Sequence, residues 1–86
     1  MRIQGAVIKE QGITFGVVVV KQHVVQNRSE ANRAINSFSP VFGRIPVVLM
    51  SQNHRGIPTY LGRNDIVNFL ANIPMSAIPW REYTIN

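Results

Sequence analysis

The 86-residue chain contains no cysteine, and its four acidic side chains are fewer than half of its nine lysines and arginines. Without cysteine there is no disulfide, no thiol nucleophile, no dithiol redox chemistry and no cysteine-ligated zinc site. This composition is compatible with a reducing cytoplasm, which is where we expect the protein to be located. Glycines occur singly, so the sequence has no loop of the kind that cradles a phosphate group, and we predict no cofactor.

Long apolar runs are also absent, because none approaches the roughly 18 residues that a membrane-spanning helix needs. The N-terminal segment MRIQGAVIKEQG is interrupted by Gln4, Lys9 and Glu10, so it does not have the apolar region of a signal peptide. We therefore expect a soluble protein with no membrane partner. We also expect one globular domain spanning residues 1–86, with a thin core, because so short a chain buries only about 60 to 65% of the surface that its unfolded form exposes.

Residues that could carry out catalysis or hold a metal are few and widely spaced. His23 and His54 are the only histidines, and the carboxylates are spread along the chain with no metal-ligand spacing. Ser51, His54 and Asp65 could form a catalytic triad on paper, but no nucleophile-elbow pattern surrounds Ser51. We predict no catalytic residue and no metal site. An enzyme is the least favoured class, since its site would have to be assembled from unmarked polar residues at a dimer cleft.

Strand and helix signals alternate along the chain. Strand-like segments separated by turns occur at residues 2–9, 13–20, 44–50 and 57–62, with a further short one at 80–85. Asn27 and Glu30 have the spacing of a capping box, and Asn64 and Asp65 offer a cap and a first-turn acid for a second helix. The predicted fold is a small single-domain α/β (α+β) sheet of four to five mixed strands, in the order ββαββα(β), with two helices.

Two of these strands have apolar residues on both faces. In segment 13–20 one face carries Phe15, Val17 and Val19, and the other carries Val18 and Val20. Segment 44–50 shows the same two-sided pattern. Continuous apolar runs are typical of parallel strands that are covered on both sides. We predict that these two segments are parallel neighbours joined by the first helix.

The position of the helices determines whether a second subunit is needed to cover these strands. Helices on opposite faces would give a closed three-layer domain, whereas helices on one face would leave Val18, Val20, Val48 and Met50 exposed. Soluble monomers rarely expose such an apolar patch. Because two short helices can hardly cover both sides of four or five strands, the sequence favours the second arrangement. We predict a homodimer with these four side chains in its interface.

From Val17 to Ile73 the predicted order of elements resembles the βαββα portion of the thioredoxin fold. The segment RGIPT at 55–59 is similar to the segment that carries the cis-proline in that family. The family's Cys-x-x-Cys motif has no counterpart, since KQHVVQNRSE occupies its place before the first helix. The resemblance implies a shared topology and no redox activity.

The net charge of +5 comes mainly from arginine, and the arginines are scattered singly. His54 and Arg55, in the turn before segment 57–62, and Arg63, just after it, are the candidate ligand-binding residues. At ~3.3 Å per residue they are about 17 Å apart, which is too far for one small anion but within reach of a longer polyanion.

These observations predict a non-catalytic, homo-oligomeric protein-interaction or scaffold domain. The alternative is a weak nucleic-acid or polyanion binder that uses scattered arginines. The alternative has the net charge in its favour, but no basic run or nucleic-acid-binding motif accompanies it.

Overall fold

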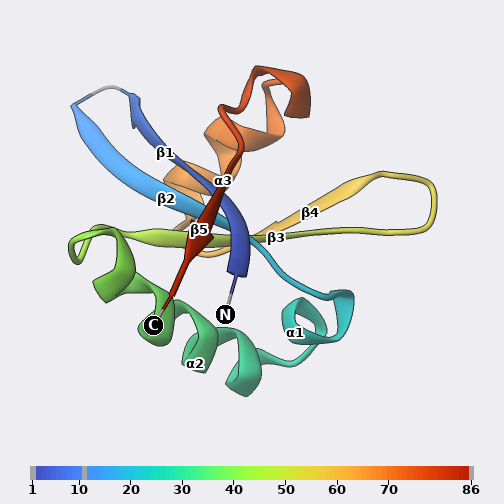
Figure 1. Ribbon diagram of the computed structural model, residues 1–86. Helices are drawn as coiled ribbons and strands as arrows, with labels where there is room; N and C mark the ends of the chain where they lie inside the picture. Colours follow the sequence, from blue (N-terminus) through green and yellow to red (C-terminus); the bar gives the residue numbers. More distant parts are fainter. Residues whose placement is uncertain (1, 11, 86) are drawn as a thin grey trace.

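A five-stranded mixed sheet in the order β4-β3-β2-β1-β5 forms the centre of the computed structural model, which describes residues 2–10 and 12–85 (Figure 1). The central strands β2 and β3 are parallel, and the other neighbours are antiparallel. Both the predicted fold class and the predicted parallel pair are confirmed. The strands are β1 (Arg2–Glu10), β2 (Ile13–Val19), β3 (Val47–Gln52), β4 (Pro58–Leu61) and β5 (Arg81–Thr84).

The helices begin close to where the sequence places them. In α2 (Arg28–Phe38) the Glu30 backbone N–H donates to Oδ1 of Asn27 at 3.1 Å, which is the predicted cap. Helix α3 (Asn64–Ala71) has Arg63 at its N-cap position, so Asn64 is the first helical residue and does not act as the predicted cap. A short helix, α1 (Gln22–Gln26), lies in a segment that showed no helix signal.

The helices cover opposite faces of the sheet (Figure 1). Helices α1 and α2 lie on one face and α3 on the other, which corrects the expectation that both predicted helices share a face. Short 3-10 turns extend the cover. The turn η1 (Ser39–Phe42) follows α2, and η2 (Met75–Ala77) follows α3. Trp80 fixes η2 against the sheet by donating its indole N–H to the Met75 carbonyl at 3.1 Å.

The four residues predicted to form a dimer interface do not form one surface. The parallel register places Val18 opposite Leu49, and Val17 opposite Val48. Val18 therefore faces α2, whereas Val48 and Met50 face α3. Val18 and Val48 are fully buried and Met50 is 3% exposed within a single chain.

Val20, the fourth of these residues, packs half-buried against the α2 side of the core. The bare apolar face that motivated the homodimer is thus filled by the chain's own helices and 3-10 turns. A second copy would have to bind elsewhere. The outermost strands, β4 and β5, each have one edge that pairs with no other described strand.

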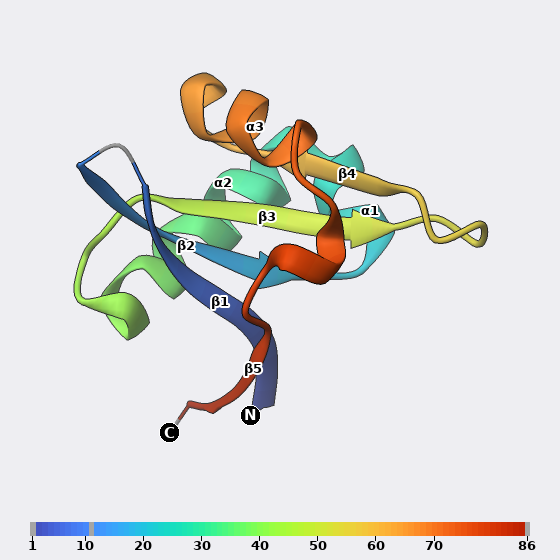
Figure 2. The same ribbon diagram turned by 90° about the horizontal axis from the view of Figure 1, so that it is seen from above.

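The β3–β4 hairpin extends beyond the helices. In both views its loop, drawn in yellow, projects away from the rest of the molecule (Figures 1 and 2). A proline near the start of a strand predicts an edge or strand-entry position; β4 begins at Pro58 and is the last strand in the sheet order. Gly62 ends this strand next to β3, where a Cβ would come within 2.9 Å of Cγ2 of Val48. A larger residue would push the two chain segments apart.

Candidate functional site

The three predicted ligand-binding residues lie at opposite ends of β4. His54 and Arg55 are exposed in the hairpin loop, and Arg63 is exposed between β4 and α3. The loop is held by Asn53, whose Oδ1 accepts the backbone N–H groups of Arg55 at 2.9 Å and Ile57 at 3.0 Å. The structure thus keeps Arg55 and Arg63 apart, as the strand length predicts, and does not assemble a compact anion site from them.

Arg63 is already engaged within the chain. Its Nε lies 2.8 Å from Oδ1 of Asp65, and its Nη2 lies 2.9 Å from Oδ2. The hydrogen bonds from Arg63 lower the pKa of the Asp65 carboxyl below its usual value. This pairing was not predicted, although the two residues are close in sequence. It leaves less of the Arg63 guanidinium for a ligand.

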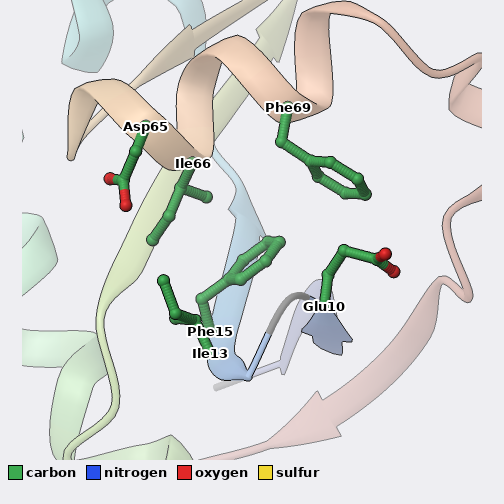
Figure 3. Close-up of a pocket in the computed structure, with 6 residues that line it drawn as sticks. All are labelled: Glu10, Ile13, Phe15, Asp65, Ile66 and Phe69. Atoms are coloured by element: carbon green, nitrogen blue, oxygen red, sulfur yellow. The ribbon is translucent and has the colours of Figure 1, made fainter.

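A small pocket of about 40 Å³ lies beside the start of α3 (Figure 3). Glu10 and Asp65 border it, but they lie on opposite sides of the Phe15 ring and their carboxylates point away from each other. Phe15 packs edge-to-face on Phe69, with ring centroids 6.2 Å apart. A mechanism that uses paired carboxylates needs two groups that converge on one substrate. This pocket does not provide them.

Within residues 2–10 and 12–85, no three histidine, aspartate or glutamate side chains are grouped so that they could hold a metal ion. In that same part of the chain, no helix combines the length and apolarity needed to cross a membrane.

The outer edge of β4 presents backbone hydrogen-bonding groups. The Asn53 N–H donates to the Ile57 carbonyl at 3.0 Å, so the Ile57 backbone faces β3. Because the backbone direction alternates along an antiparallel strand, Thr59 and Leu61 also face β3, while Pro58 and Tyr60 face outward. The carbonyl of Pro58 and both backbone groups of Tyr60 therefore point away from the sheet. The missing N–H of Pro58 fits this assignment, since β3 does not need it as a donor.

An open groove lies near this edge on each face of the sheet, beside Pro58 and Tyr60 on one face and at the Leu61 end of β4 on the other. The groove on the α2 side, which we name the basic groove, has a volume of about 390 Å³. The groove on the α3 side, the apolar groove, has a volume of about 470 Å³. Arg28, Asn32, Leu61, Arg63 and Asn64 contribute to the basic groove. The apolar groove is lined by Ile57, Pro58, Tyr60, Leu70, Ile73 and Met75, among others.

Tyr60 connects the edge with the apolar groove. Its ring packs against the α3 side of the core, and its hydroxyl is buried without a hydrogen-bond partner among the described residues. Burial raises the pKa of this hydroxyl above the ordinary value of 10.0. A buried donor without a partner is destabilising, so native proteins leave few of them. The sequence around Tyr60 carries no motif that signals this buried hydroxyl.

Comparison of the chain with protein-family models, with curated proteins and with solved structures gave no match. The resemblance to thioredoxin therefore rests on the order of elements alone. The described residues contain no cis peptide bond, so Pro58 in the RGIPT segment is preceded by a trans bond, unlike the family's proline. The segment that stands in place of the family's Cys-x-x-Cys motif forms α1 and the start of α2.

Proposed function

We propose that this chain is a non-catalytic protein-interaction module that binds an extended segment of a partner along the outer edge of β4. The observation that carries the proposal is the outward direction of the backbone groups at Pro58 and Tyr60, with the apolar groove beside them and the basic groove at the Leu61 end of the strand. Added strands are a common mode of peptide recognition: main-chain hydrogen bonds supply affinity, and pockets for alternate side chains supply specificity.

The covered sheet faces support this choice of surface. Helices α1 and α2 on one side and α3 on the other bury the central valines Val17, Val18, Val47 and Val48, so these side chains are not available to a partner. The edge strand, in contrast, carries no charged residue between Pro58 and Leu61. The cysteine-free composition supports a reducing compartment such as the cytoplasm as the place where the module works.

A second copy of the chain is an alternative partner and preserves the homodimer predicted from the sequence. Two β4 strands related by a twofold axis at Tyr60 would exchange a pair of Tyr60 N–H to carbonyl bonds. Pro58 limits this arrangement, because it has no N–H to offer to the facing strand. A heterologous segment meets Pro58 once, whereas the twofold pair meets a proline from each copy, so a heterologous segment is the partner that we favour.

Selection from a displayed random-peptide library, followed by amide hydrogen exchange, tests the proposal. Selected peptides should slow the exchange of the Tyr60 amide and should lose binding when N-methylated at every second position, because only alternate amides face β4. N-methylation at the intervening positions is the matched control. Binders that leave the Tyr60 amide unchanged, or that tolerate N-methylation everywhere, would refute the proposal. Slowed Tyr60 exchange at high protein concentration without peptide would identify the second copy as the partner.

The polyanion alternative has its support in the net charge of +5 and the exposed position of Arg55. Its test is binding to a mixed-sequence oligonucleotide at several salt concentrations. Removal of one arginine–phosphate pair should reduce the slope of log K against log salt by about 0.9. Replacing Arg55 and Arg63 together by glutamine should therefore lower the slope by about 2 if each contacts one phosphate. Absence of binding at low salt would remove this alternative.

A further inference from the structure

The two grooves beside β4 differ in chemistry. The apolar groove has no charged residue in its lining. The basic groove contains two arginines and the amides of Asn32 and Asn64. Of the arginines, Arg63 is held by Asp65, whereas Arg28 has no ion-pair partner among the described residues. The two sides of the edge would therefore select different side chains.

A strand added beside β4 would reach both grooves in alternation. Successive side chains of a strand point to opposite faces of its sheet. In β4 itself, Tyr60 belongs to the α3 side of the core and Leu61 to the α2 side. A bound strand would share this alternation, so every second side chain would point to the α3 side, where the apolar groove lies beside Pro58 and Tyr60. The intervening side chains would point to the α2 side, where the basic groove lies at the Leu61 end of β4.

We propose that the segment recognised by β4 alternates apolar and acidic residues, with apolar side chains directed to the apolar groove and carboxylates directed to Arg28. This inference rests on the proposed function. Charge complementarity supports it. A carboxylate opposite the unpaired Arg28 guanidinium gains a charge-assisted hydrogen bond. In addition, a chain with net charge +5 attracts acidic segments over longer distances.

The test uses a synthetic seven-residue peptide, acetylated and amidated, in which leucines alternate with glutamates. Calorimetry measures its affinity for the intact chain at low salt, and two further peptides have glutamine in place of glutamate or serine in place of leucine. We expect the glutamate peptide to bind about twofold to fivefold more tightly than the glutamine peptide, within the range for a partly exposed ion pair. The serine peptide should bind more weakly than either, since it leaves the apolar groove unfilled.

Matched variants of the protein locate the effect. Arg28→Gln should abolish the preference for glutamate over glutamine, while Arg33→Gln removes the same charge from an exposed position of the same helix and should leave the preference intact. On the other side, Ile57→Thr should weaken binding of the leucine peptides. Val41→Thr, at another exposed apolar position, is its control.

The outcomes separate this inference from the proposed function. Equal binding of the glutamate and glutamine peptides, with N-methylation still effective at alternate positions, would refute the acidic rule and leave edge binding intact. A preference for glutamate that survives Arg28→Gln but not Arg33→Gln would place the acid elsewhere and refute the rule as well. If none of the peptides binds and library selection yields no ligand that protects the Tyr60 amide, both proposals fail. Competition by an oligonucleotide that also loses affinity in Arg28→Gln would show that the basic groove binds polyanions, which overturns the peptide proposal.

Discussion

The two edges of the sheet differ in how they are protected. β5 exposes Arg81 and Glu82, and Glu82 lies 3.6 Å from Arg2 on the neighbouring β1. β4 carries no charge and has an open groove on each side. Charged side chains on an edge strand disfavour pairing with another chain. In a small sheet, charged side chains can thus protect one edge from pairing with another chain while the other edge remains able to pair.

The strands next to these edges differ in how fully they are buried. β3, beside β4, is buried along all of its length except Gln52, whereas β1, beside β5, alternates between buried and exposed residues. A strand covered on both faces is rigid, because its side chains are packed from both directions. The β4 edge is thus attached to the most tightly packed part of the sheet. A rigid support reduces the entropy that is lost when a partner binds.

The largest expected effect is in the core beside β4. Leu49 is fully buried on the α2 side, so Leu49→Ala should lower the free energy of unfolding by about 2 to 5 kcal/mol. Ile3→Ala, in β1 beside β5, should cost less, because Ile3 is 8% exposed near the end of its strand. Denaturant unfolding of both variants measures the difference. Equal destabilisation would show that the two halves of the sheet are equally well packed and would remove the distinction between them.

Much of this fold could be predicted from local patterns. The apolar runs in β2 and β3 indicated the parallel pair, and the Asn27–Glu30 spacing indicated the start of α2. The register between neighbouring strands could not be predicted from local patterns. Counting odd and even positions gives the two faces of one strand, but grouping Val18 with Val48 requires the register, which places Val18 opposite Leu49. The cover of both faces was underestimated because α1, η1 and η2 are too short to give a periodic signal.

The candidate site was less accessible still. Pro58 indicates an edge or strand-entry position, and the strand that begins there is an edge strand. The basic groove, however, brings Arg28 of α2 next to Arg63, which follows β4, and no spacing in the sequence connects them. The orphaned Tyr60 hydroxyl is also a product of packing, since tyrosine hydroxyls usually reach water or a partner. Tertiary contacts, and not motifs, define this surface.

Substitution of the tyrosines in the two edge strands should have effects of intermediate size on stability. Tyr60→Phe removes the unpartnered hydroxyl and should leave stability unchanged or raise it by up to about 1 kcal/mol. Tyr83→Phe, in β5, keeps the edge-to-face contact with Phe42 at 5.1 Å and should give no gain. Thermal unfolding of the two variants at neutral pH compares them. A clear loss of stability in Tyr60→Phe would mean that its hydroxyl has a partner after all.

The raised pKa of Tyr60 extends this comparison to alkaline pH. Folding holds the proton on Tyr60 to a higher pH than in the unfolded chain, because burial disfavours the phenolate. This contribution to stability is complete below the unfolded value of 10.0 and is lost as the pH rises through the folded pKa. The parent should therefore lose more stability than Tyr60→Phe above pH 10.0. Parallel curves of stability against pH for parent and variant would show that the hydroxyl ionises as easily in the folded chain as in the unfolded chain.

The smallest expected effect concerns the ion pair next to β4. Arg63 lowers the pKa of Asp65 by hydrogen bonding, so the pair contributes stability above the unfolded value of 3.8, which is lost as the pH falls through the folded pKa. Both side chains are about half exposed, so Asp65→Asn should change thermal stability little at neutral pH.

The informative measurement for Asp65→Asn is peptide binding, because the variant releases the Arg63 guanidinium at the basic groove. Affinity for the glutamate peptide should rise by about twofold to threefold, and affinity for the glutamine peptide should not change. Glu82→Gln, which releases Arg2 beside β5, is the matched control and should leave both affinities unchanged; an equal rise in that variant would attribute the gain to net charge and not to the groove beside β4.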